Sequence, residues 1–302
     1  MTEKTNYILQ GGRVIDPSRG IDQIMDIGVA NGRICSPERI SDAANLDLKG
    51  LVVAPGFIDM HVHLRQPGKV AAETIRTGTM AAAAGGFTSV VAMPNTNPVA
   101  DTAGTIEYLR RHTEREGVVR VFPCGAMTKG LEGKEMSGIG SLKAAGVIAI
   151  SDDGKCIQNH ELMRHVMEYS KSFNLPVLDH CEDDLLAGNG VMHEGYWSTL
   201  LGMKGMSSAS EELMLARDII LARGTGSKIH IQHLSSKESV RLIREARAEG
   251  VLVSGEVTPH HLTLTDEFIK HFDTNYKMNP PLRSEEDRQA LIAGLRDGTI
   301  TV

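Results

Sequence analysis

The chain has 302 residues, enough for one large α/β domain and a small satellite, and its 41% hydrophobic and 23% charged residues are ordinary for a globular protein. A net charge of −6 and an aromatic content of 4% exclude the basic stripe and the base-stacking surface of a nucleic-acid-binding protein. No apolar stretch of the sequence reaches the ~18–20 residues that a membrane span needs, and the N-terminus has no signal-peptide pattern, so we expect a cytoplasmic protein. The four cysteines form no CxxC pair, and we expect buried free thiols.

Residues 1–54 predict a small β module. The segment 7–17 is typical of strand, turn and strand, with Gly11 and Gly12 at the turn. Asn31 and Gly32 lie between two β-prone runs, which is a good hairpin signal. Residues 45–51 predict one more short strand. These strands are too few to form a stable domain alone.

Residues 55–302 follow a different pattern, in which apolar strands alternate with amphipathic helices. The expected strands lie near 52–63, 88–94, 119–127, 146–152, 175–181, 228–234 and 251–258. The expected helices lie at 71–84, 102–115, 160–172, 210–222, 237–248 and 285–295. Seven strand–helix units with an eighth strand starting at 298–302 predict a (β/α)₈ TIM-type barrel that stops within strand 8. An open doubly wound sheet is disfavoured, because no glycine-rich phosphate loop follows the first strand.

Polar residues recur where the predicted strands end, which is where barrel enzymes carry their active sites. Side chains alternate along a strand, so His61 and His63 share a face at the end of the first strand. His180 and His233 end the fifth and sixth strands, and Asp153 ends the fourth. Imidazole and carboxylate are ligands of catalytic zinc. We therefore predict a metal site of these five residues, with Asp153 placed to bridge two metals.

Several neighbours of these residues leave alternatives open. Asp152 is the alternative to Asp153 as the ligand, or it caps the loop. His230 lies three residues before His233 on one strand, so only one of the two faces inward, and we expect His230 to be structural and hydrogen-bonded among helices. His260 and His261 are either further ligands or residues that shape the site.

Arg65 has the same parity as His61 and His63, so its guanidinium would be costly to place beside cations. A fixed guanidinium there indicates an anionic substrate group such as a carboxylate. Asn95, after the second strand, is placed to add a neutral donor to that group. The alternative for Arg65 is a salt bridge to Glu73 or Asp59.

These motifs together resemble a dihydroorotase, and more narrowly the long-chain type I branch of that family within the amidohydrolase superfamily. They occur in the family order, at 56–68, 84–88, 93–96, 151–154, 180–183, 233–235 and 279–283. The resemblance implies reversible cyclisation of N-carbamoyl-L-aspartate to L-dihydroorotate in pyrimidine biosynthesis. It also implies one or two zinc ions per subunit, held by His61, His63, Asp153, His180 and His233, with the substrate bound by Arg65, Asn95 and Asn279.

The same resemblance supplies expectations about partners and about the end of the chain. The partners expected are a small-molecule substrate, possible aspartate carbamoyltransferase, and a further copy of the chain in a homo-oligomer, with no nucleic acid and no membrane. The family's general base is an Asp of an Asp-His-Ala-Pro motif in strand 8, and the sequence stops short of it at Val302. We therefore expect a piece of a longer protein, whose later strands complete the β module.

Two other functions remain as alternatives. One is a non-catalytic dihydroorotase-like subunit that scaffolds aspartate carbamoyltransferase, but such relatives typically lose the metal histidines. The other is a related cyclic amidase, an allantoinase or hydantoinase. Asp153 stands where hydantoinases and dihydropyrimidinases keep a carboxylated Lys, and Arg65 with Asn95 fits a substrate carboxylate, so both features disfavour this second alternative.

Overall fold

The computed structural model of the protein describes residues 6–302. The chain divides into two compact units, Met1–Phe57 and Ile58–Val302, and each is described here by itself. Within the described residues, no helix is both long enough and apolar enough to cross a membrane.

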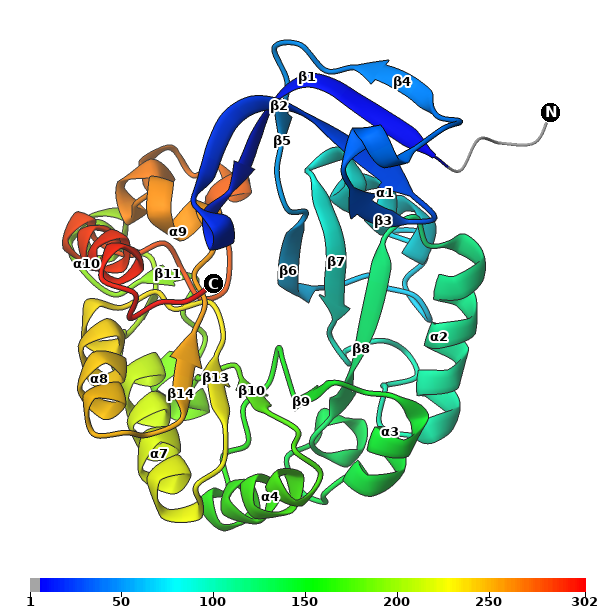
Figure 1. Ribbon diagram of the computed structural model, residues 1–302. Helices are drawn as coiled ribbons and strands as arrows, with labels where there is room; N and C mark the ends of the chain where they lie inside the picture. The colour runs from blue at the N-terminus through cyan, green and yellow to red at the C-terminus, as the bar shows by residue number, and fades with distance from the viewer. Residues whose placement is uncertain (1–5) are drawn as a thin grey trace. The chain divides into compact units, whose positions relative to one another are not determined.

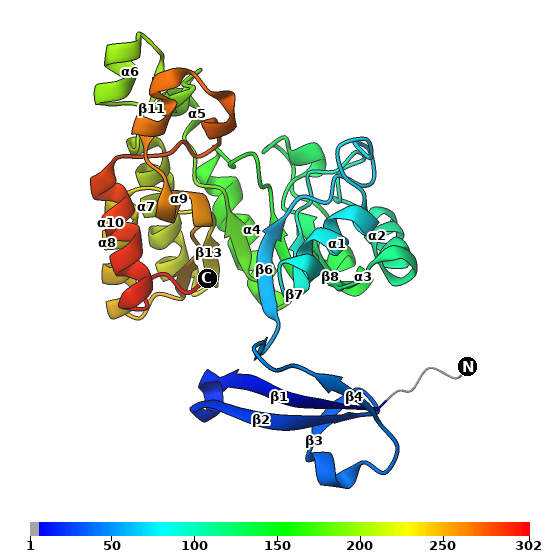
Figure 2. The ribbon, with the colours of Figure 1, turned by 90° about the horizontal axis from the view of Figure 1, so that it is seen from above.

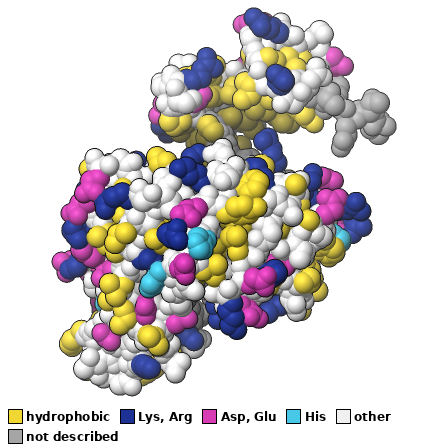
Figure 3. All heavy atoms as spheres, turned by 90° about the horizontal axis from the view of Figure 1, so that it is seen from below, with side chains coloured by type: hydrophobic (Ala, Val, Ile, Leu, Met, Phe, Trp, Pro, Cys, Tyr) yellow, Lys and Arg dark blue, Asp and Glu magenta, His cyan; other side chains and the backbone are white. Residues whose placement is uncertain are grey.

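The first unit is a small β-sheet with two short 3₁₀ helices, η1 (Pro17–Arg19) and η2 (Pro37–Arg39). Its strands are β1 (Tyr7–Asp16), β2 (Ile21–Ala30), β3 (Arg33–Cys35), β4 (Ala44–Asp47) and β5 (Val52–Val53). The sheet order is β3-β2-β1-β4, and β5 pairs with the far half of β1. Apolar side chains such as Ile24 and Ile34 are strongly exposed on this unit, and Figure 3 shows hydrophobic side chains gathered on its visible face.

The two predicted turns of this unit have different outcomes. The Asn31-Gly32 hairpin is confirmed: both residues have positive φ (52° and 71°), and Ala30 pairs with Arg33 across the turn. The turn predicted at Gly11 and Gly12 is wrong. β1 runs through it as one strand, and the register against β2 shifts between Leu9 and Gly12 as in a β-bulge. Gly11 has φ 69°, so it absorbs the extra residue of the bulge without breaking the strand.

The second unit is a parallel sheet curled into a barrel with helices outside it, which confirms the predicted α/β TIM-type fold (Figure 1). The seven strands stand in the order β14-β13-β10-β9-β8-β7-β6. Their bounds are β6 (Phe57–Val62), β7 (Phe87–Ala92), β8 (Arg120–Ala126), β9 (Ala149–Ser151), β10 (Val177–Asp179), β13 (Ile229–Ile231) and β14 (Val253–Gly255). The main helices are α1 (Ile75–Ala84), α2 (Ala103–Glu116), α3 (Ile139–Ala145), α4 (His160–Ser172), α7 (Ala209–Thr225), α8 (Lys237–Ala248) and α10 (Glu285–Arg296).

The last residues of the chain extend this sheet beyond β14. The backbone N–H of Thr301 donates to the carbonyl of Gly255, and the N–H of Val257 donates to the carbonyl of Val302, both at 3.0 Å. These are the first bonds of the eighth strand that the sequence predicts at 298–302, although the segment is too short to count as a strand here.

A segment of short elements between β10 and α7 was not predicted. It consists of α5 (Asp184–Ala187), β11 (Met192–His193), α6 (Tyr196–Leu201) and β12 (Gly205–Met206). Three further short helices follow β14, namely α9 (Pro259–Thr263), η4 (Asp266–His271) and η5 (Thr274–Tyr276). α6 contacts η4, and Figure 2 shows both segments together at one end of the barrel. Elements of two to six residues have too few turns to produce a periodic hydrophobic pattern.

Strand alternation divides the core into two clusters. One side of the strands contributes Val91, Met93, Cys124, Ala149 and Leu178 to a small cluster inside the barrel. The other side packs against the helices in a larger cluster that includes Ile150, Val177 and Ile229. The side chains of both clusters are almost completely buried. Close packing on both sides of the strands holds the strand ends rigidly, so they can present polar side chains at fixed positions. The visible face of this unit in Figure 3 mixes acidic and basic side chains without a stripe of one sign.

Candidate metal centre

Four imidazoles surround one carboxylate at the mouth of the barrel. Oδ1 of Asp153 lies 3.2 Å from Nε2 of His61, 3.6 Å from Nε2 of His233 and 3.8 Å from Nδ1 of His180. Oδ2 of Asp153 lies 3.3 Å from Nε2 of His63. The structure thus brings together all five residues that the sequence singles out, and ligand atoms of His61, Asp153 and His233 lie within 4.8 Å of one another.

These five residues lie at the carboxyl ends of four strands of the sheet. His61 belongs to β6 and His63 follows it, His180 directly follows β10, and Asp153 and His233 come two residues after β9 and β13. Strand parity alone does not place His233, because β13 ends at Ile231 and His233 has a left-handed backbone with φ 33°. The turn after the strand, rather than the pleat, points its ring to Asp153.

In three of the four imidazole rings, the second nitrogen also has a hydrogen-bond partner. Nδ1 of His61 lies 2.6 Å from Oε1 of Glu256, and Nδ1 of His63 lies 2.9 Å from Oδ1 of Asn95. Nε2 of His180 lies 3.4 Å from Oε2 of Glu182. Partners of this kind orient metal-binding histidines and fix their tautomers. The rings therefore have their free nitrogens turned to a common centre, which fits a divalent cation.

Two of these partners, Glu256 and Glu182, were missed at the level of sequence. Glu256 directly follows β14, at the same end of the sheet as the histidines, and Glu182 lies two residues after His180. Both positions were available from strand order.

The electrostatics of the centre follow from burial and close charges. Burial alone lowers the pKa of His61, but hydrogen bonds to Asp153 and Glu256 outweigh it and raise the pKa to about 10. Burial raises the pKa of Asp153, yet hydrogen bonds from His233 and His61 hold it well below its usual range. Burial lowers the pKa of His63 and of His233. Nδ1 of His180 and Nε2 of His233 are 2.7 Å apart, so without a metal one of these nitrogens carries a hydrogen and donates a hydrogen bond to the other.

The alternatives to these ligands have other partners. Asp152 accepts hydrogen bonds from the backbone N–H groups of Met127 (2.8 Å) and Thr128 (3.0 Å), so it caps the loop after β8. His230 contacts the strand β14 and Glu256, at 2.8 Å from Oγ of Ser254 and 3.2 Å from Oε2 of Glu256, and not the helices as expected.

The residues expected to bind substrate lie around the same mouth. The half-buried Arg65 makes no ion pair with Glu73, Asp59 or any other residue in the described part of the chain. Its backbone is left-handed, with φ 54°. The amide oxygen of Asn95 is engaged by His63, and Nδ2 of Asn279 donates to Oε2 of Glu182 at 2.8 Å.

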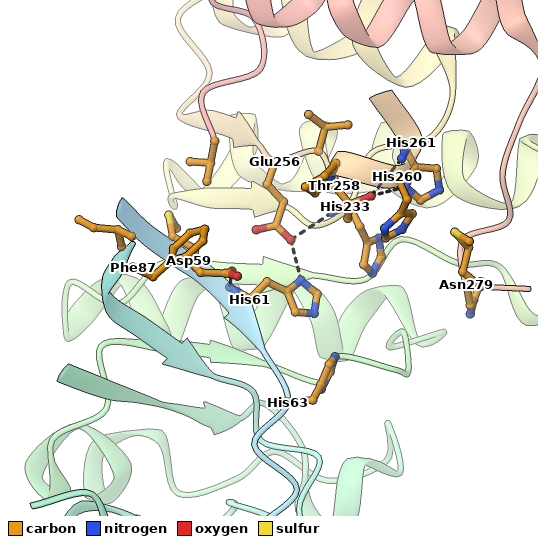
Figure 4. A pocket seen from close by; sticks show the side chains of 16 residues that line it. Asp59, His61, His63, Phe87, His233, Glu256, Thr258, His260, His261 and Asn279 are labelled. Atoms are coloured by element: carbon orange, nitrogen blue, oxygen red, sulfur yellow. Dashed lines mark hydrogen bonds and ion pairs between the residues drawn. The ribbon is translucent and has the colours of Figure 1, made fainter. Parts of the chain in front are cut away.

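A cavity of about 510 Å³ opens beside the centre. Its lining includes His61, His63, His233, Glu256, His260 and Asn279, which Figure 4 shows around a common space. His261 also borders it but is tied to the protein, because its Nδ1 lies 2.7 Å from Oγ1 of Thr258 and its Nε2 lies 3.1 Å from the carbonyl of Pro280. Asn279 lines this cavity, whereas Arg65 and Asn95, the other residues expected to bind substrate, are not among its lining residues.

Comparison with known proteins decides the family. A family model described as Dihydro-orotase-like matches residues 50–239. A dihydroorotase of Caldanaerobacter subterraneus is 52% identical over 296 residues, which are 97% of this chain and 68% of the relative. A dihydroorotase of Pelotomaculum thermopropionicum is 50% identical over 298 residues, which are 98% of this chain and 70% of the relative. The chain belongs to the dihydroorotase family. It is an enzyme of the cyclic amide hydrolase class, and the dihydroorotase reaction is its function.

Solved structures agree on the fold of this dihydroorotase-family chain. The L-hydantoinase of Arthrobacter aurescens superposes with a TM-score of 0.83 at 21% identity, covering 97% of this chain and 67% of that one. A D-hydantoinase superposes with a TM-score of 0.81 at 22% identity, covering 98% and 67%. At this identity the likeness establishes the barrel architecture alone. The dihydroorotase family is metal-dependent, and the chain carries a group of residues able to hold a metal ion.

Proposed function

We propose that His61, His63, Asp153, His180 and His233 form the zinc centre of a dihydroorotase that interconverts L-dihydroorotate and N-carbamoyl-L-aspartate in pyrimidine biosynthesis. The observation that carries the proposal is the position of Asp153, one carboxylate within 3.8 Å of four imidazole nitrogens. Neutral imidazole and carboxylate are the donors that catalytic zinc accepts, and the set lacks the thiolates of a purely structural site.

The geometry also supports room for one or two ions. Oδ2 of Asp153 faces His63, whereas Oδ1 faces His61, His180 and His233, so its two oxygens address different parts of the cluster. Zinc bound there would polarise a carbonyl oxygen and lower the pKa of water. The residues of the chain keep the imidazoles oriented and exclude bulk water on the barrel side, where Asp153 is only 2% exposed.

Substrate orientation is assigned to Arg65, Asn95 and Asn279. The guanidinium of Arg65 has no carboxylate partner among residues 6–302, so it is available for the carboxylate that both dihydroorotate and carbamoyl aspartate carry. Nδ2 of Asn95 and the amide of Asn279 add neutral donors and acceptors beside it. Fixing that carboxylate sets the distance between the reacting carbonyl and the metal centre. The proposal assigns no general base among residues 6–302.

Three finer assignments belong to the same proposal. Asp153, in place of a Lys, supports the type I long-chain branch. Reduced cysteines support a cytoplasmic location, since the four cysteines are free in the described structure. The intact cluster of histidines favours an enzyme over a scaffold for aspartate carbamoyltransferase, although binding to that protein is compatible with it.

The direct test is His61→Ala with metal analysis and assay of both reaction directions. The proposal expects loss of bound zinc and of activity. The matched control is His165→Ala, because His165 is an exposed residue of α4. Zinc content and activity of His61→Ala equal to those of the control would refute the assignment.

A further inference from the structure

Glu256 is a buried carboxylate whose two oxygens both have hydrogen-bond partners beside the candidate metal centre. It is 5% exposed and directly follows β14. Its Oε1 lies 2.6 Å from Nδ1 of His61 and accepts the backbone N–H of His233 at 3.2 Å. Its Oε2 lies 3.2 Å from Nε2 of His230. Figure 4 shows the contacts to His61 and His233 from the side of the cavity.

These contacts determine which nitrogen of His61 is free. An ionised carboxylate can only accept hydrogen bonds, so Nδ1 of His61 must carry the proton between it and Glu256. When a metal displaces the second proton of the ring, the lone pair that it needs is therefore on Nε2, which lies 3.2 Å from Asp153.

A second side chain competes with Glu256 for Nδ1 of His61, so the position of the ring proton depends on which partner prevails. Nε2 of Gln232, a residue 1% exposed, also lies 3.2 Å from Nδ1 of His61. The hydroxyl of Ser151, 3.1 Å from Oε1 of Gln232, keeps the amide oxygen turned away, so the NH₂ group faces the ring. An amide donor would make Nδ1 an acceptor and move the ring proton to Nε2, where it would block a metal.

The same carboxylate also links separate strands. β6 and β14 are the two ends of the strand order in the barrel sheet. Glu256 joins His61 of β6 to the end of β14, and through the N–H of His233 it fixes the left-handed turn after β13. One side chain therefore acts on two candidate ligands that come from different strands.

We propose that Glu256 is a positioning residue of the metal centre, which selects the metal-binding tautomer of His61 against Gln232 and holds the turn that carries His233. The proposal rests on the zinc centre proposed above. It predicts that metal affinity, and not only activity, depends on Glu256.

The test uses the full chain with Glu256→Ala and Glu256→Gln. Zinc dissociation constants are measured by competition with a chromophoric chelator. We expect an affinity loss of about 100-fold for the alanine variant and about tenfold for the glutamine variant, which keeps the volume and one acceptor. The control is Asp287→Asn, because Asp287 is a buried carboxylate that accepts hydrogen bonds from the N–H groups of Lys237 and Ser284, at the starts of α8 and α10, and it contacts none of the five candidate ligands in the described structure. We expect its zinc affinity to stay within about twofold of the wild type, which is less than the roughly 10–100-fold loss that follows removal of a residue that orients a metal ligand.

A second readout separates positioning from general structural support. In zinc-loaded protein labelled with ¹⁵N-histidine, the Nδ1 proton of His61 should resonate far downfield and exchange slowly, because it is held at 2.6 Å by a carboxylate. In Glu256→Gln that resonance should move upfield and exchange faster, even where the alanine variant does not fold. In the Asp287→Asn control it should not move.

Two outcomes overturn the inference in different ways. If His61→Ala loses zinc but Glu256→Gln keeps wild-type affinity and the wild-type Nδ1 resonance, the positioning role is wrong and the zinc centre stands. If His61→Ala itself keeps wild-type zinc affinity, the proposed metal centre fails, and the inference about Glu256 fails with it.

Discussion

Zinc and protons should compete for His61, and the size of that competition can be worked out. The pKa of His61 in the metal-free protein is raised from 6.5 to about 10, despite burial that lowers it, by hydrogen bonds to Asp153 and Glu256. The difference corresponds to about 5 kcal/mol at 1.36 kcal/mol per pH unit. Because the metal-free ring is protonated between pH 6.5 and 10, binding a metal must release one proton from it.

The consequence is a steep pH dependence of metal affinity. The apparent association constant should rise about tenfold per pH unit from this proton alone, or about 100-fold between pH 6.5 and 8.5. The stability of the metal-free fold depends on pH in the opposite direction. A raised histidine pKa adds stability that is fully present below pH 6.5 and is lost as the pH rises through about 10.

Calorimetry at pH 8 in two buffers with different ionisation enthalpies counts the protons released per zinc. Water at the metal can release a proton of its own, so we expect the wild type to release at least one proton per zinc at pH 8 and a zinc affinity that rises with pH. Release of no proton, or a wild-type affinity that does not change between pH 6.5 and 8.5, would refute the reasoning.

Three further predictions test other parts of the description. Arg65→Ala should raise KM roughly 10–100-fold with zinc content unchanged, because it removes a charge-assisted contact to the substrate carboxylate; loss of zinc in metal analysis would instead make Arg65 structural. Burial lowers the pKa of His261 to about 3, so below pH 6.5 the unfolded state binds a proton at His261 that the folded state does not bind. The free energy of unfolding should therefore fall as the pH drops from 6.5 towards 3, by up to about 5 kcal/mol. Urea unfolding of His261→Gln should show a shallower dependence of this free energy on pH, and the same dependence as in the wild type would contradict the prediction. Ile150→Ala should lower the free energy of unfolding, measured in urea, by about 2–5 kcal/mol, since Ile150 is fully buried in the core. The control Ile148→Ala should lower it much less, because Ile148 is 40% exposed. Equal losses in the two variants would be inconsistent with the packing described.

The barrel could be predicted from the sequence because its signals are long and periodic. α4 and α8 begin and end at the predicted residues, since each has a strong apolar face and a polar cap at its first turn. The glycine pair at 11–12 was misread, because a bulge and a tight turn both use a glycine with positive φ and the local sequence does not distinguish them.

The residues of the site could be predicted from the sequence, but the hydrogen bonds between them could not. Residues at the ends of parallel strands converge, so the five candidate ligands could be named from strand order alone. The parity argument for His233 was insufficient, because the strand had already ended. The partner of His61 lies 195 residues away in Glu256, and only the three-dimensional fold places such a contact.

The left-handed turn after β13 couples the candidate metal centre to a backbone conformation. The N–H of His233 donates to Oε1 of Glu256 at 3.2 Å, and the same oxygen lies 2.6 Å from Nδ1 of His61. Removal of a bound ion would therefore relax this turn together with the two rings, and amide exchange should accelerate at His233 before it does within β9 or β10.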